Sequence, residues 1–155
     1  MHHLVLVSKA GHQRAYPLGR PGFDLGEDAV LFEQHDTTWG PFGYLSRDAR
    51  WLILGYYTGT RSNDLWVVDF ARWRKTGELK KTPILVGAEA RCSGPIQGNT
   101  LYLHTTLDAP NQRVFAVDLE RPNREHWKEV IPTRKDSVLR GLSLSKGALV
   151  ATYLR

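Results

Sequence analysis

Residues 51–70, WLILGYYTGTRSNDLWVVDF, contain two apolar runs separated by a polar loop. Successive side chains of a β-strand point to opposite faces, so the odd and even positions of a run describe its two faces. In the first run Trp51 and Ile53 fall on one face, while Leu52 and Leu54 fall on the other. The run 65–68 is apolar in the same way. Both runs therefore predict strands that are buried on both faces, as in a sheet stacked between two other sheets.

The pattern of this stretch recurs along the chain. LWVVDF at 65–70 is matched by VFAVDL at 114–119, and the apolar run 51–57 is matched by LYLHT at 101–105 and by ALVATYL at 148–154. Turn-type residues precede these central runs, and short apolar strands at 29–34, 83–87 and 127–131 close the units. No segment shows helical periodicity over about 11 residues. The sequence predicts an all-β fold, a partial β-propeller of four-stranded antiparallel blades that repeat at about 50 residues.

We expect a single propeller segment with just over three blades. A partial blade is predicted over 1–36, two blades over 37–87 and 88–133, and the first two strands of a further blade over 134–155. These units amount to about thirteen strands, whereas closed propellers have about four to eight blades. The segment is therefore expected not to close a ring alone and to be a piece of a larger propeller.

The composition limits the classes of partner. Charged residues make up 24% of the chain and hydrophobic residues 41%, which is an ordinary balance for a folded domain. The formal net charge is +5, but the basic residues are scattered in turns beside acidic ones or gathered in a polar link at 72–81. That scatter favours solvated loops over a nucleic-acid surface. No apolar run approaches the roughly 18 residues of a membrane helix, and the single cysteine, Cys92, forms no internal disulfide. We expect a cytoplasmic protein without nucleic-acid or membrane partners.

Two longer runs resemble a known family. TTWGPFGYLSRDARWLILGYYTGTRSNDLWVVDF (37–70) is similar to the propeller of the prolyl oligopeptidase family of serine peptidases, where a Trp-Gly-Phe-Gly-like stretch leads into a strand and a tight turn. LYLHTTLDAPNQRVFAVDLERPNREHWKEVIP (101–132) resembles that propeller more specifically, through its Thr-x-Leu-Asp-Ala-Pro loop and its Trp-to-Pro ending. Two departures affect the first turn: Ala49 stands where the family usually has Gly, and Pro41 is inserted before Phe42.

The resemblance implies a propeller joined to a peptidase domain with a Ser-Asp-His triad, whose access it restricts to short peptides. The chain has no Gly-x-Ser-x-Gly motif, so no catalytic residue can be assigned to it. We expect a non-catalytic segment without peptidase activity of its own. Its expected partners are the peptidase domain of the parent protein or another copy of itself and, in the parent, proline-containing peptides. The alternative is a stand-alone half-propeller that assembles with itself and serves as a binding or scaffold module.

Three residues are candidates to face the axial channel or a peptidase domain, because they precede or begin inner strands: Trp39, Phe42 and Cys92. An aromatic side chain there offers an apolar wall to a proline-containing peptide. Each candidate also has a simpler interpretation, which is packing between blades for the aromatic residues and a small buried hydrophobe for the cysteine. The strand tryptophans are predicted to lie in the core: Trp51, Trp66 and Trp127.

Other residues with chemical potential have structural explanations. His2, His3 and His12 match no spacing of a tetrahedral metal site, so neither a metal nor another cofactor is expected. Asp69 and Asp118 recur at equivalent strand ends, about 49 residues apart in different blades, so we predict that they cap turns rather than act as an acid–base pair.

Overall fold

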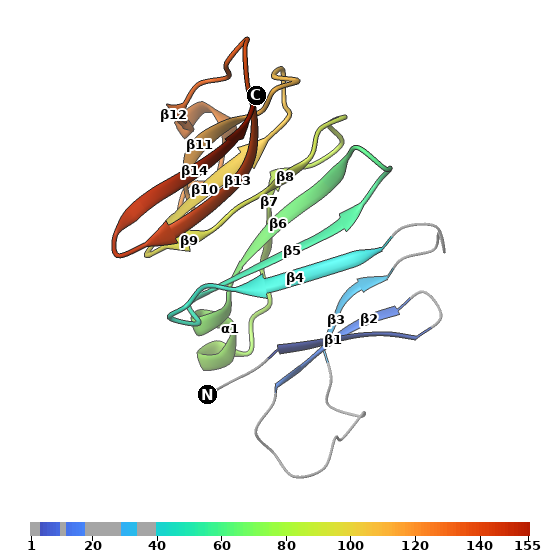
Figure 1. The fold of residues 1–155 in the computed structure, drawn as a ribbon. Helices are drawn as coiled ribbons and strands as arrows, with labels where there is room; N and C mark the ends of the chain where they lie inside the picture. Colours follow the sequence, from blue (N-terminus) through green and yellow to red (C-terminus); the bar gives the residue numbers. More distant parts are fainter. Residues whose placement is uncertain (1–3, 10–11, 18–28, 34–39) are drawn as a thin grey trace.

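The structure is a computed structural model that describes residues 4–9, 12–17, 29–33 and 40–155, with side chains from residue 40 onward. Its strands form four antiparallel sheets in chain order (Figure 1). The first sheet contains β1 (Leu4–Lys9), β2 (His12–Pro17) and β3 (Ala29–Glu33). Four-stranded and larger antiparallel sheets stacked in this way make the chain a partial β-propeller, and the predicted fold class is confirmed. The predicted blade boundaries at 36, 87 and 133 remain a prediction.

The second sheet has the strand order β4-β5-β6-β7, formed by β4 (Pro41–Leu45), β5 (Trp51–Tyr57), β6 (Asn63–Asp69) and β7 (Lys81–Leu85). Residues 51–55 of β5 are all buried, as the apolar run predicted. Trp51 and Ile53 belong to a core shared with the third sheet, whereas Leu52 and Leu54 pack with Phe70 on the opposite face. The second sheet is thus buried on both sides.

The third sheet has five strands because its inner strand is divided into two short pieces. These pieces are β8 (Cys92–Ser93) and β9 (Ile96–Gln97), which both pair with β10 (Thr100–Thr105). The outer strands are β11 (Arg113–Asp118) and β12 (Lys128–Ile131). At the break, a Cβ atom on Gly94 would lie 1.8 Å from the carbonyl oxygen of Tyr102, so only glycine lets the two backbones come this close.

The fourth sheet is the pair β13 (Val138–Ser145) and β14 (Ala148–Leu154). Its first strand begins beside the third sheet, where the backbone amide of Leu139 donates to the carbonyl oxygen of Asn111 at 3.0 Å. Among the described strands, β14 pairs with β13 alone. Val150 and Leu154 of β14 are 44% and 54% exposed, so this outermost strand carries apolar side chains in contact with solvent.

Two short helices interrupt the strands, although the sequence predicted none. They are α1 (Phe70–Thr76) and a 3-10 turn, η1 (Arg124–His126). Helix α1 has only seven residues, which is too short for periodicity to reveal. The prediction that Asp69 caps a turn is confirmed, because its side chain accepts from the backbone amide of Arg72 at 2.9 Å and begins α1. Asp118 likewise accepts from the amide of Glu120 at 3.0 Å.

The three strand tryptophans differ in burial. Trp51 is 4% exposed and lies in the core, as predicted. Trp66 and Trp127 are only partly buried, so the prediction of a full core position is wrong for both. Trp66 lies on the face of the second sheet that turns away from the third and stacks on Tyr56 with ring centroids 5.4 Å apart. Trp127 is not in a strand but at the end of η1, directly before β12.

A set of polar contacts joins the second sheet to the third. The guanidinium group of Arg50 donates to Asn99 Oδ1 at 2.7 Å and to Glu120 Oε1 at 2.6 Å, and it lies 4.7 Å from the Trp51 ring centre. On the edge strand β4, the hydroxyl of Tyr44 donates to the carbonyl oxygen of Gly94 at 2.9 Å. The two edge strands β4 and β8–β9 are therefore neighbours across the sheet boundary.

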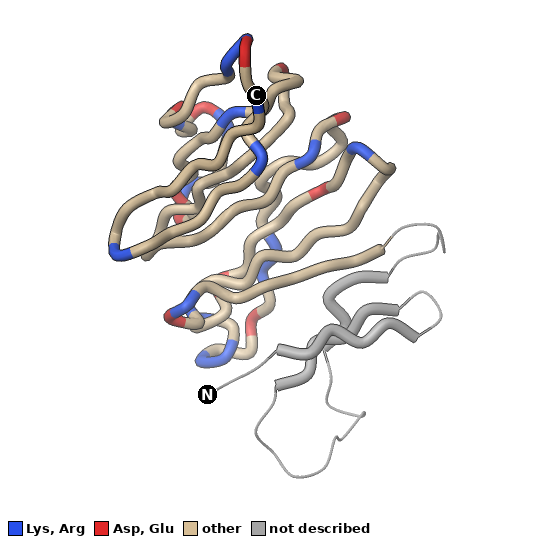
Figure 2. Tube along the Cα trace, in the orientation of Figure 1, with Lys and Arg blue, Asp and Glu red and all other residues tan. Residues whose placement is uncertain are grey.

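Positive and negative side chains are interspersed over the turns of the described chain (Figure 2). Several arginines are paired with nearby carboxylates, including Arg72 with Glu78 at 2.8 Å and Arg124 with Asp108 at 3.1 Å. In the described part, no helix combines the length and the apolar character that crossing a membrane requires.

Candidate functional site

The three candidate residues have different positions in the structure. Trp39 lies outside the described residues. Phe42 and Cys92 both border one hollow of about 410 Å³, which we call the inner hollow. It lies at the starts of β4, β8 and β13, the edge strands of three successive sheets, and its lining also includes Tyr57, Arg91, Ser93, His104, Gln112 and Arg140.

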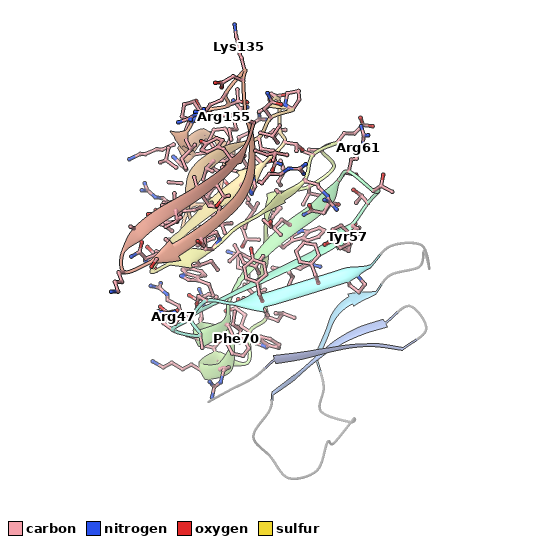
Figure 3. All side chains as sticks on the ribbon, in the orientation of Figure 1. Arg47, Tyr57, Arg61, Phe70, Lys135 and Arg155 are labelled. Carbon is pink, nitrogen blue, oxygen red and sulfur yellow. The ribbon has the colours of Figure 1, made fainter. Side chains whose placement is uncertain are left out.

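The strand arrangement explains why these residues meet. Neighbouring strands are antiparallel, so the start of β4 lies beside the end of β5, and the start of β8 lies beside the end of β10. Tyr57 is the last residue of β5, and His104 is opposite Ser93 in the register of β10 and β8. Figure 3 shows Tyr57 at this end of β5 and Arg47 at the opposite end, in the turn between β4 and β5.

Phe42 and Tyr57 form an aromatic wall. Their ring centroids are 5.2 Å apart, and Tyr57 is 40% exposed. The Phe42 ring occupies the space above Gly55, where a Cβ atom would lie 2.4 Å from its Cζ atom and 2.7 Å from the backbone oxygen of Asp64. The glycine therefore fixes where the Phe42 ring lies. Phe42 also packs against the core between the second and third sheets, so its packing between sheets is confirmed while it also borders the inner hollow. Its contact with a substrate remains a prediction.

Cys92 is among the residues that line the inner hollow, but only 2% of the residue is exposed. The Asn63 amide donates to the carbonyl oxygen of Cys92 at 2.9 Å and lies 3.3 Å from its Sγ, and the Cys92 amide donates to Asn63 Oδ1 at 2.9 Å. Burial raises the pKa of the Cys92 thiol to about 12. A protonated, enclosed thiol is a structural group rather than a nucleophile.

The charges around the inner hollow are one-sided. Arg91 and Arg140 line it, and no aspartate or glutamate is among its lining residues. Neither arginine forms an ion pair with the described part of the chain, and the Arg91 Cζ lies 5.9 Å from the Tyr57 ring centre. Burial lowers the pKa of His104, so its imidazole is neutral near pH 7. Its Nε2 atom is buried and has no hydrogen-bond partner among the described residues.

The sequence analysis did not identify Arg91, His104, Arg140 or Tyr57 as site residues. Their proximity depends on strand register and on which ends of three sheets coincide. The register could have suggested them, because Phe42, Tyr57 and Cys92 all lie at strand ends on the same side of the repeat.

The inner hollow can bind a ligand but has no complete catalytic set. Ser93 and His104 are cross-strand neighbours, yet no hydrogen bond joins their side chains, and no carboxylate lines the hollow to orient the imidazole. Within the described residues no cluster of three His, Cys, Asp or Glu side chains is placed to hold a metal ion. The side chains of His2, His3 and His12 lie outside this part.

A second hollow, of about 640 Å³, lies at the opposite ends of the same edge strands. Its walls are the turns that follow β4 and β9 and the turn between β13 and β14, with Arg47, Asp48 and Lys146 at its rim. Because these are hairpin turns with mixed charge, the second hollow offers no grouping of like charges or aromatic rings comparable to that of the inner hollow.

Stacked antiparallel sheets with aligned edge strands define the chain as part of a β-propeller. Residues 18–155 match the family described as the prolyl oligopeptidase N-terminal beta-propeller domain. The chain belongs to this family, and the resemblance inferred from its sequence is confirmed.

Similar proteins support the assignment. The chain is 31% identical over 114 residues to a prolyl endopeptidase of Elizabethkingia miricola. This alignment covers 73% of the chain and 15% of that relative. It is 28% identical over 127 residues to the dual function macrocyclase-peptidase POPB of Amanita bisporigera, covering 79% of the chain and 17% of the relative. The chain thus spans about a sixth of the length of these relatives.

Solved structures have the same fold. One, from a study of two prolyl endopeptidases, superposes with a TM-score of 0.81 at 27% identity, over 99% of this chain and 23% of that chain. Another is prolyl oligopeptidase B of Galerina marginata bound to a 35mer substrate, with a TM-score of 0.77 at 21% identity over 98% of this chain and 22% of that chain.

Proposed function

We propose that the chain is a non-catalytic part of the propeller of a prolyl oligopeptidase-like peptidase, and that this propeller limits access to short peptides. The observation that carries the proposal is the alignment of β4 with β8–β9, held by the Tyr44 hydroxyl on Gly94. Edge strands that follow one another in this way line the axis of a propeller. A ring of such strands leaves a narrow axial passage that excludes folded proteins by size.

The peptidase domain of the parent protein is the proposed partner, and proline-containing peptides are the proposed substrates of that parent. Family membership supports both. The chain alone is expected to be inactive, because the inner hollow lacks a carboxylate beside Ser93 and His104. A cytoplasmic location remains a prediction, supported by the single cysteine, since disulfides are rare in that compartment.

A chimaera tests the access role. Residues 18–155 replace the matching segment of the Elizabethkingia miricola prolyl endopeptidase, and cleavage of a short prolyl peptide is compared with cleavage of a folded protein. We expect the chimaera to cleave the peptide and leave the folded protein intact. Equal cleavage of both substrates would refute the access role. The chain alone should give no turnover above a heat-denatured control, and inhibitor-sensitive hydrolysis by it would refute the inactive assignment.

The second candidate is a stand-alone module that self-assembles. It is favoured by the exposed apolar side chains of β14, whose outer edge pairs with no strand of the described chain. Unpaired edges of this kind attract other strands. We predict a homodimer of the 155-residue polypeptide, measured by light scattering coupled to size exclusion, which Val150→Lys would weaken. A monomer that persists as the concentration rises would contradict self-assembly and favour the peptidase parent.

A further inference from the structure

We propose that the inner hollow binds the carboxylate of a peptide between Arg91 and Arg140, with the neighbouring side chain of the peptide against Phe42 and Tyr57. The choice of a peptide rests on the proposed function, whereas the choice of a carboxylate rests on the residues of the hollow. In this proposal the residues that bind the carboxylate all belong to this chain, so binding does not require a catalytic domain.

Charge is the first argument. Two guanidinium groups share a hollow of about 410 Å³ without a lining carboxylate, and neither forms an ion pair within the described residues. Arg113, in contrast, reaches Asp108 at 3.6 Å and Glu129 at 3.5 Å. Two arginines that line one hollow without a carboxylate leave their donor groups available to an anion, which accepts charge-assisted hydrogen bonds from them.

The residues that line the hollow limit the chemical class of the anion that fits it. Arg91 lies beside the Tyr57 ring, and Tyr57 is paired with Phe42, so the cationic groups adjoin an aromatic surface that is partly open to solvent. A free inorganic anion gains nothing from such a surface. A peptide with an apolar residue next to its carboxylate fits both parts at once. The volume lies within the range of about 300–1,000 Å³ typical of small-ligand sites.

The remaining polar groups suit a peptide backbone. Ser93 and Gln112 line the hollow, and their side chains have no hydrogen bond within the described chain. The Nε2 atom of His104, in the same wall, is buried and therefore not available to a ligand, so Ser93 and Gln112 are the uncharged polar side chains that the hollow offers.

The test is calorimetric titration of the whole chain with acetyl-Gly-Pro-Phe as the free acid and as the C-terminal amide. These two probes differ only in the charge of the terminal group. We expect the acid to bind and the amide to bind about tenfold more weakly or worse. Arg91→Gln and Arg140→Gln should each weaken binding of the acid about fivefold or more, and the lysine variants at the same positions should recover part of it.

Arg47→Gln is the matched control, because it removes one positive charge at the opposite end of the sheet. It should change binding of the acid by less than about twofold, since exposed charges at that distance are screened. Thermal unfolding of all variants shows whether they remain folded, and both arginines of the hollow are exposed, so their loss should leave the midpoint unchanged.

Four outcomes would overturn the proposal. They are equal binding of acid and amide, no binding of either, an effect of Arg47→Gln as large as that of Arg91→Gln, and displacement of the peptide by inorganic phosphate at the same concentration. The last would mean a general anion site. All four outcomes are measured as peptide binding, whereas the chimaera experiment measures peptide cleavage. A failure of the carboxylate site can therefore be distinguished from a failure of the proposed access role.

Discussion

Replacing Asn63 with alanine should strongly destabilise the contact between the second and third sheets. Asn63 is 3% exposed, and its side-chain amide makes hydrogen bonds to both the backbone N–H and the backbone carbonyl of Cys92. The pairing resembles a strand ladder, but it runs from a side chain of β6 to the backbone of β8. Alanine removes the amide and leaves both backbone groups without partners in a buried position.

The magnitude follows from these two groups. A buried backbone donor or acceptor left unsatisfied costs about 1–3 kcal/mol, so Asn63→Ala should lower the free energy of unfolding by about 2–6 kcal/mol. Asn123 provides a matched control, because it is exposed and its side chain does not cap η1. Asn123→Ala should change stability by less than about 0.5 kcal/mol.

Urea unfolding followed by tryptophan fluorescence measures both variants. With a slope of about 1–3 kcal/mol per molar urea, the midpoint of Asn63→Ala should fall by about 0.7 M or more. If the midpoints of Asn63→Ala and Asn123→Ala coincide, the Asn63 amide does not stabilise the sheet contact. That result would mean that the Cys92 backbone finds water or another partner.

Three further predictions concern burial, ionisation and backbone strain. Trp51→Ala should cost about 3–5 kcal/mol and Trp66→Ala less, because only Trp51 is fully enclosed; a reversed order in urea midpoints would contradict the burial. Burial raises the pKa of both Tyr44 and Cys92 to about 12. The folded state therefore holds these protons more tightly than the unfolded chain, and stability should be full below about pH 9 and decline as the pH rises toward about 12. Midpoints that stay constant over that range would refute the buried positions. Ala49→Gly should stabilise the protein by up to about 1 kcal/mol, because Ala49 has a φ of 56°; a lower melting temperature would exclude strain at this turn.

The sequence predicted the strands well, because their burial leaves a direct pattern. The run 51–55 is apolar at every position and is buried at every position. Polar turns predicted the hairpins, and the turn around Ala49 forms despite the missing glycine, with the Ala49 amide donating to the Ser46 carbonyl at 2.9 Å. Local chemistry was sufficient for these features.

Features that depend on contacts between strands or between sheets could not be predicted in this way. The division of the inner strand into β8 and β9 accompanies the close approach of Gly94 to Tyr102 of the neighbouring strand β10, which no local pattern shows. Among the site residues, Phe42 and Cys92 were predicted separately, each from its own position at the start of an inner strand. Arg91 and Arg140 come from different sheets, so the fact that they line one hollow is evident only when the sheets are stacked.

The third sheet packs on the second through a shared core and through the hydrogen bonds between Tyr44 and Gly94, which is the nearest-neighbour contact of a one-dimensional array. The inner strand of the third sheet is attached to the sheet before it, since Gly94 exchanges hydrogen bonds with the Tyr44 hydroxyl of β4 and also lies against β10. Stability in stacked repeats is approximately a sum of nearest-neighbour interfaces. Loss of a terminal sheet from such an array removes one interface and leaves the others intact, whereas loss of an inner sheet removes two. Because each interface in such an array involves only neighbouring sheets, a propeller built in this way can gain or lose terminal blades without a new core.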